Sequence, residues 1–184
     1  MGDLSFAGIG GMARAMSEPL VDCVIEDARW EAFGLEALAG RACAAALDHL
    51  GTGTAGYLVV VMGCDDARIA ALNADFRGKP KPTNVLSWPS EDRAPEAEGA
   101  EPDLPEAGDA DDPAELGDIA LAWETCAAEA ADQGKTMEAH VTHLVVHGLL
   151  HCLGYDHLTE PDAAVMEGHE VAILASLGLS DPYS

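Results

Sequence analysis

The stretch HGLLHCLGYDH, residues 147 to 157, carries three histidines within eleven residues. His147 and His151 are four residues apart in an apolar segment, so on a helix their side chains lie on one face, about 40° apart around the axis. Gly154 can end that helix in a left-handed conformation, and the following turn brings His157 back toward the pair. The spacing therefore predicts a metal site at the end of a long helix, with the three histidines as ligands.

The number and type of these ligands indicate what the metal does. Three neutral imidazoles suit zinc, with nickel, copper and cobalt as other fits. A closed structural zinc site needs a fourth protein ligand, commonly a thiolate, whereas three ligands leave one position for water or substrate. Cys152 points about 100° away from His151 on the helix, so we interpret it as a small buried hydrophobic residue. An open, catalytic site with one zinc ion per chain follows.

Two further histidines, His140 and His143, precede the pair in the same helical pattern. By spacing alone, His143, His147 and His151 are also a possible ligand trio. Residues stacked at this interval rise about 6 Å per step, so one ion would not easily contact all three. His157, after the turn, is the better third ligand.

The rest of the chain predicts an α/β fold. Residues 20–25 form a short apolar run typical of a strand, residues 35–50 repeat apolar residues at helical spacing, and residues 57–62 form an apolar run that favours a buried central strand. The further expected elements are a helix from Asp65-Asp66 to near Gly78, an edge strand at 85–88, a strand at 116–123, a short helix at 124–133, the long helix from Thr136, and a last helix from Glu160 to near Gly178. We expect one domain at residues 20–180 and a mobile tail at residues 1–19.

The charge of the chain is strongly negative and unevenly distributed. The 184 residues include 33 Asp and Glu against 9 Lys and Arg, a net charge of −24, which disfavours nonspecific adhesion to nucleic acid or to an anionic membrane. Residues 90–116 hold eleven acidic side chains and only one basic one, Arg93. This segment lacks apolar periodicity, so we expect a disordered or loosely ordered insertion with no apolar surface to bury. The alternative is an anionic segment that covers a basic groove and competes with substrate.

Cysteine usage and hydropathy indicate the compartment. The five cysteines are odd in number and form no C-x-x-C pair, so a disulfide framework is not expected and a reducing cytoplasm fits. No apolar run approaches the eighteen or so residues that span a bilayer, and the first nineteen residues lack the pattern of an export signal. We expect a cytoplasmic protein without a membrane partner.

Residues 77–84 concentrate anion-compatible groups in this acidic chain. Lys79, Thr83 and Asn84, with Lys81, follow Arg77 closely, and we expect the first three to bind substrate. Arg77 is the candidate catalytic cation. Its other interpretation is a surface arginine at the C-terminal end of a helix.

Two reaction classes use a metal site of this kind. The ligand spacing H-x3-H-x5-H is that of zinc peptidases, which have glutamate as general base where this chain has Gly148. Glycine accepts no proton, so peptidase activity is disfavoured unless Asp156 or Glu170 serves as a substitute base. The other class is phosphodiester cleavage, in which the metal polarises a phosphoryl oxygen or lowers the pKa of water, and Arg77 stabilises the developing charge.

Three segments closely resemble the YbeY family of bacterial endoribonucleases. They are LNADFRGKPKPTNVLSWP at 72–89, LGDIAL at 116–121 and HLVVHGLLHCLGYDH at 143–157. The three occur in the family's order and leave little of the domain uncovered, apart from the N-terminal tail and the acidic insertion. Residues 86–89 read LSWP where LSFP is commoner, an exchange of aromatic side chains that should leave the strand intact.

The resemblance implies a single α/β domain with a small mixed β-sheet packed against helices. It implies zinc on His147, His151 and His157, Arg77 as the functionally important arginine, and cleavage of single-stranded RNA. The implied roles are ribosomal RNA maturation, including the 3′ end of 16S rRNA, and ribosome quality control, with the ribosome, its small-subunit proteins and the GTPase Era as partners. A non-catalytic assembly factor with a structural metal remains open at this point.

Overall fold

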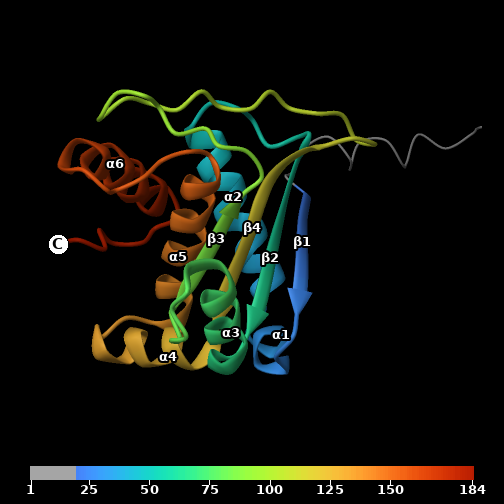
Figure 1. The fold of residues 1–184 in the computed structure, drawn as a ribbon, viewed down its shortest axis with the longest axis vertical. Coiled ribbons are helices and arrows are strands. Elements are labelled where there is room, and N and C mark those ends of the chain that lie inside the picture. The colour runs from blue at the N-terminus through green and yellow to red at the C-terminus, as the bar shows by residue number, and fades with distance from the viewer. Residues whose placement is uncertain (1–19) are drawn as a thin grey trace, which may run out of the picture.

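A mixed four-stranded sheet organises the computed structural model, which describes residues 20–184 (Figure 1). The strand order is β1-β2-β4-β3. β1 (Leu20–Ile25), β2 (Tyr57–Cys64) and β4 (Ala114–Ala122) are parallel to one another, and β3 (Val85–Pro89) pairs antiparallel with β4 at the edge. The expected α/β class and mixed sheet are confirmed. The tail expected at residues 1–19 lies outside the described residues.

Six helices connect and cover these strands in the described part of the chain. Their starts follow the capping residues: the side chain of Asp65 accepts from the backbone N–H of Arg68, and that of Thr136 from the N–H of Ala139. None of the helices in residues 20–184 combines the length and hydropathy needed to cross a bilayer. The helices are α1 (Ala28–Phe33), α2 (Leu35–His49), α3 (Asp66–Arg77), α4 (Trp123–Asp132), α5 (Met137–Cys152) and α6 (Glu160–Ser176).

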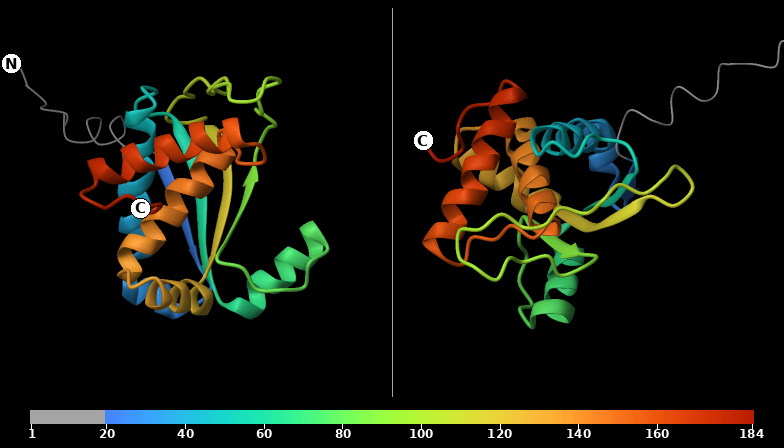
Figure 2. Two further views of the ribbon diagram at one scale, coloured as in Figure 1. Left: turned by 90° about the vertical axis from the view of Figure 1, so that its left-hand side faces the viewer. Right: turned by 90° about the horizontal axis from the view of Figure 1, so that it is seen from above.

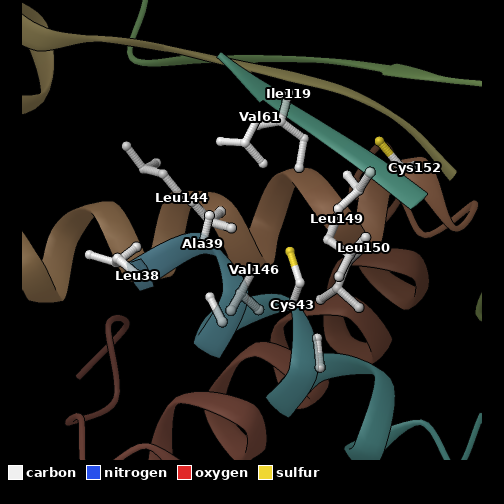
Figure 3. Close-up of a cluster of buried hydrophobic side chains, with 14 of the residues drawn as sticks. Leu38, Ala39, Cys43, Val61, Ile119, Leu144, Val146, Leu149, Leu150 and Cys152 are labelled. Carbon is white, nitrogen blue, oxygen red and sulfur yellow. The ribbon is translucent and has the colours of Figure 1, made fainter. Parts of the chain in front are cut away.

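The helices form unequal layers on the two faces of the sheet. α2 and α5 pack against one face and α6 packs on both of them, whereas α3 lies on the other side, against β4 (Figure 2). The alanine-rich face of α2 lets it approach α5 closely, and Cys43 lies beside Val146 and Leu150 in a fully buried cluster (Figure 3). Val61 and Ile119 of the sheet cover the other side of α5. The helix that carries His147 and His151 is therefore held on both flanks.

The apolar run at β2 is fully buried on only one face of the sheet. β2 is central, between β1 and β4, as predicted. However, Val59 and Val61 are buried whereas Val60 and Met62 are half-buried. The reason is that α3 covers only part of the outer face, so alternate residues of this run remain partly accessible to solvent.

The acidic segment between β3 and β4 crosses the end of the domain that lies at the top of Figure 1. Residues 90–113 contain no helix or strand, as expected. The expectation that they bury no apolar surface is wrong, because Leu104 packs against the main core and the neighbouring residues Pro102 and Pro105 are buried. The hydroxyl of Tyr57 donates to the carbonyl of Pro105 at 3.0 Å, which fixes the segment to the start of β2.

Candidate metal centre

The end of α5 positions the first two histidines. His147 and His151 are half-buried in its last two turns, and Gly154 follows with φ of 102°, the left-handed ending that the sequence predicted. A Cβ at this position would also lie 2.6 Å from the backbone oxygen of Arg93. Both reasons require glycine here. The turn it allows returns the chain to His157, which is exposed beside the helical pair.

The three imidazoles converge on one point. The Nε2 atoms of His147 and His151 are 3.0 Å apart, and the ring of His157 lies 5.3 Å and 5.0 Å from theirs, centroid to centroid. One ring nitrogen of each lies within 4.8 Å of the others. Two nitrogens that bind one tetrahedral zinc at 2.0–2.1 Å lie about 3.3–3.4 Å apart. The 3.0 Å of the helical pair is near this spacing, so the two nitrogens are placed to hold one metal ion between them.

Hydrogen bonds set which nitrogen of each helical histidine faces the others. Nδ1 of His147 lies 2.5 Å from Oε1 of Glu170, and Nδ1 of His151 lies 3.0 Å from the backbone oxygen of Tyr155. Both partners are acceptors, so each Nδ1 carries the proton and each Nε2 keeps its lone pair. This is the tautomer that a metal needs.

The surroundings also keep His151 uncharged. Its burial, together with the positive charge that His147 and His157 would place beside it, lowers the pKa of His151 to about 4. A neutral imidazole is the form that binds metal, so the site does not have to lose a proton at this position near neutral pH.

Glu170 supports the histidine cluster by accepting the hydrogen bond from Nδ1 of His147. Burial alone would raise its pKa, but hydrogen bonds from neighbours that include His147 and Tyr183 outweigh burial and lower the pKa to about 2, so the carboxylate is ionised. His143, His147 and Glu170 form a second cluster of metal-ligating side chains. The 2.5 Å between Glu170 and His147 is a hydrogen-bond distance that leaves no room for an ion.

This geometry bears on Glu170, one of the two substitute bases that the sequence offered, and on Gly148, whereas the other candidate base, Asp156, lines the pocket. Glu170 is fully buried and contacts the Nδ1 side of His147, away from the ligand nitrogen, so it is not placed to activate water at the metal. Gly148 lies against the sheet, where a Cβ would be 3.0 Å from Cγ2 of Ile119. The position of the peptidase glutamate therefore faces β4, and a longer side chain has no space there.

Cys152 is also placed as expected. Its side chain is 1 % exposed within the main core, and burial raises its pKa to about 12. A thiol of this kind is protonated and inaccessible, so it does not complete the histidine set.

A pocket of about 600 Å³ contains the three histidines and residues from other parts of the chain. Arg77, the last residue of α3, lines it, as do Thr83 and Asn84. The amide of Asn84 already has partners, since Nδ2 donates to Glu129 at 2.9 Å and Oδ1 accepts from the next backbone N–H. Asn84 is thus held in place as part of the wall.

Lys79 does not line this pocket, and its expected contact with substrate stays a prediction. Gly78 ends α3 in a left-handed conformation, and the backbone N–H of Lys79 then bonds back to the carbonyl of Asn73 at 3.3 Å. This tight turn leaves Lys79 exposed on the outside of the chain reversal. The predicted cluster of donors is therefore divided between the pocket and the surface.

A family profile described as Endoribonuclease YbeY matches residues 22–178, which is most of the chain. The chain belongs to the YbeY family. Two YbeY relatives, each named Endoribonuclease YbeY, are similar over nearly their whole length. The protein of Cereibacter sphaeroides is 61 % identical over 90 % of this chain and 99 % of its own, and that of Dinoroseobacter shibae is 59 % identical over 89 % and 90 %.

A solution structure of a Thermotoga maritima protein has the same fold. Its TM-score is 0.51 at 19 % identity, and the match covers 90 % of this chain and 99 % of the other. At this identity the likeness concerns the fold alone. The match extends over nearly the whole chain, in agreement with the expected single domain.

Two residues of the YbeY site went unrecognised in the sequence. Glu170 was considered only as a base, because nothing in its local pattern shows that α6 brings it against α5. Arg93 lines the pocket from the acidic segment, where its composition suggested only a solvated loop. The isolated cation in an acidic run was the one available signal for Arg93.

Replacing Glu170 by glutamine is expected to weaken zinc binding about 10- to 100-fold, because the neutral amide no longer stabilises the Nδ1 proton of His147 as a carboxylate does. Titration of metal-free protein against a competing chelator measures the affinity. Glu167→Gln, on the same helix but outside both histidine clusters, is the control. Equal affinities for the two variants would show that Glu170 has no role in holding the metal.

Proposed function

We propose that this protein is a zinc-dependent endoribonuclease that cleaves single-stranded RNA. The observation that carries the proposal is the convergence of three histidine nitrogens, two of them with their second nitrogen hydrogen-bonded, in a pocket that also contains Arg77. The printed names of the relatives, endoribonucleases at 59 % and 61 % identity, support RNA as the substrate.

In this proposal each part of the pocket has a separate task. His147, His151 and His157 hold zinc, which when bound supplies Lewis acidity toward a phosphoryl oxygen or water. Arg77 offers a planar, permanently charged guanidinium to the phosphate and stabilises the negative charge that develops during cleavage. Thr83 offers a hydroxyl to the same pocket, and the bond from Asn84 to Glu129 fixes the segment before β3 that carries Thr83.

We further propose that the substrate is ribosomal RNA, with the 3′ end of 16S rRNA and defective ribosomes as targets in the cytoplasm. The net charge of −24 supports a partner that delivers the RNA, because free RNA is repelled at long range. The ribosome, its small-subunit proteins and the GTPase Era are the proposed partners.

The test is cleavage of a short single-stranded RNA by protein loaded with one zinc per chain. We expect cleavage of the single strand and at least tenfold slower cleavage of the same sequence in a duplex. A casein substrate, tested in parallel, should remain intact. Specific ribosome binding without any cleavage of ribosomal or synthetic RNA would instead identify a docking protein with a structural metal.

A further inference from the structure

The acidic segment contributes directly to the pocket of the three histidines. Its first residues, from Glu91 to Ala94, form one wall. The backbone of Arg93 packs against Gly154, the glycine that ends α5 between the second and third histidines. The segment and the histidine cluster therefore meet through the backbone and Cβ of Arg93, and the contact does not depend on its guanidinium.

The guanidinium of Arg93, in this wall, is partly buried and forms an ion pair. Its side chain is 21 % exposed and its Nη2 lies 2.5 Å from Oε2 of Glu91, whose side chain is 68 % exposed. Arg93 and Arg77 are the two lysine or arginine residues among those lining the pocket. The other charged residues there, apart from the histidines, are Glu91, Asp92 and Asp156.

We infer that Arg93 binds a phosphate of the RNA backbone next to the cleaved one, and that Glu91 occupies its guanidinium until that phosphate arrives. This inference rests on the proposed function. The ion pair with Glu91 is exposed on the carboxylate side, and such pairs contribute little to stability, so their exchange for a phosphate costs little. A guanidinium can then bind the phosphate with two parallel hydrogen bonds.

This arrangement explains how an acidic segment can lie at an RNA site. With Glu91 in place, the guanidinium of Arg93 has its partner within the acidic segment itself. When phosphate replaces Glu91, the released carboxylate is already mostly in solvent. Glu91 therefore competes with substrate, and its removal should strengthen RNA binding.

The test compares matched variants in steady-state cleavage of a short single-stranded RNA. Arg93→Ala is expected to raise KM about tenfold with kcat within about twofold, because it removes a contact made equally in the ground and transition states. The slope of log(kcat/KM) against log salt should decrease by about 0.7, the value for one phosphate contact on a single strand. Glu91→Gln should lower KM.

The chain offers a matched control for both changes. Arg41 forms an ion pair with Glu138 at 3.5 Å, both side chains are exposed, and neither lines the pocket. Arg41→Ala and Glu138→Gln should leave KM and the salt slope unchanged. Arg93→Lys keeps the charge but loses the planar, two-pronged guanidinium, so its KM should lie between those of wild type and Arg93→Ala.

The outcomes separate the inference from the proposed function. If Arg93→Ala behaves as Arg41→Ala does, or if Glu91→Gln raises KM, then Arg93 does not bind substrate, although wild type still cleaves RNA. If wild-type protein with zinc does not cleave RNA at all, the proposed function itself is wrong. In that case the inference is tested by RNA binding alone, with the fluorescence anisotropy of a labelled single-stranded RNA as the measurement. The expected order of RNA affinity is Glu91→Gln above wild type, then Arg93→Lys, then Arg93→Ala.

Discussion

Replacing His151 by alanine is expected to abolish tight zinc binding and reduce RNA cleavage to background. His151 is half-buried, its Nε2 lies 3.0 Å from that of His147, and its Nδ1 donates to the backbone oxygen of Tyr155. Loss of a hydrogen-bonding partner of a metal ligand already costs about 10- to 100-fold in affinity, so loss of the ligand itself should cost on the order of 10³-fold or more.

The measurement is metal content after purification without a histidine tag, followed by single-turnover cleavage. His49→Ala provides the control, because His49 is exposed at the end of α2 and belongs to neither metal-ligating cluster. The same loss is expected for His147→Ala and His157→Ala. Unchanged zinc content in all three single variants would place the metal elsewhere, and full cleavage by metal-free protein would exclude a catalytic metal.

Replacing Arg77 by alanine is expected to slow cleavage by about 10²-fold or more while zinc content and fold are retained. Arg77 lines the pocket from the end of α3 and takes no part in holding the metal. Its charge acts on the phosphate as negative charge develops, and loss of such a stabilising group typically has an effect of this size. Arg77→Lys should recover only part of the rate, because lysine keeps the charge but loses the planar fork.

Single-turnover rates separate this effect from weakened RNA binding. Arg68→Ala is the matched control, since Arg68 lies on the same helix, pairs with Glu26 at 2.9 Å and does not line the metal pocket. Equal rates for wild type, Arg77→Ala and Arg77→Lys would remove Arg77 from the mechanism. A loss of rate that RNA at saturating concentration fully restores would make Arg77 a binding residue only.

Most elements of the fold were predictable from the sequence because local signals agree with the tertiary structure, but the six-residue helix α1 was missed because it is too short to show a repeat of apolar residues. β1 occupies the predicted residues, and α5 begins after Thr136, whose side chain caps it. The partial exposure of β2 was not predictable, because an apolar run does not reveal that one face of the sheet is covered by a single short helix. The contacts of the acidic segment were missed for a related reason: proline and leucine buried singly leave no periodic pattern.

The site was predictable where its residues are close in sequence. The three histidines span eleven residues of a helix and its turn, so their spacing encodes their geometry. Lys79 lies outside the pocket that Thr83 and Asn84 line, which the sequence did not show, because proximity along the chain does not specify on which side of a reversal a side chain lies. Glu170 and Arg93 could not be assigned, because their roles depend on how α6 and the acidic segment pack against α5.

The histidines and the cations of the pocket come from separate stretches of the chain, and this affects how the pocket can evolve. The three histidines are encoded by one short, continuous stretch whose helix is fixed on both flanks by the core. The cations come from two other stretches, the end of α3 and the start of the acidic segment, which reach the pocket from outside that core. Under the proposed function, mutations in these two stretches would change how RNA is bound without changing the three histidines.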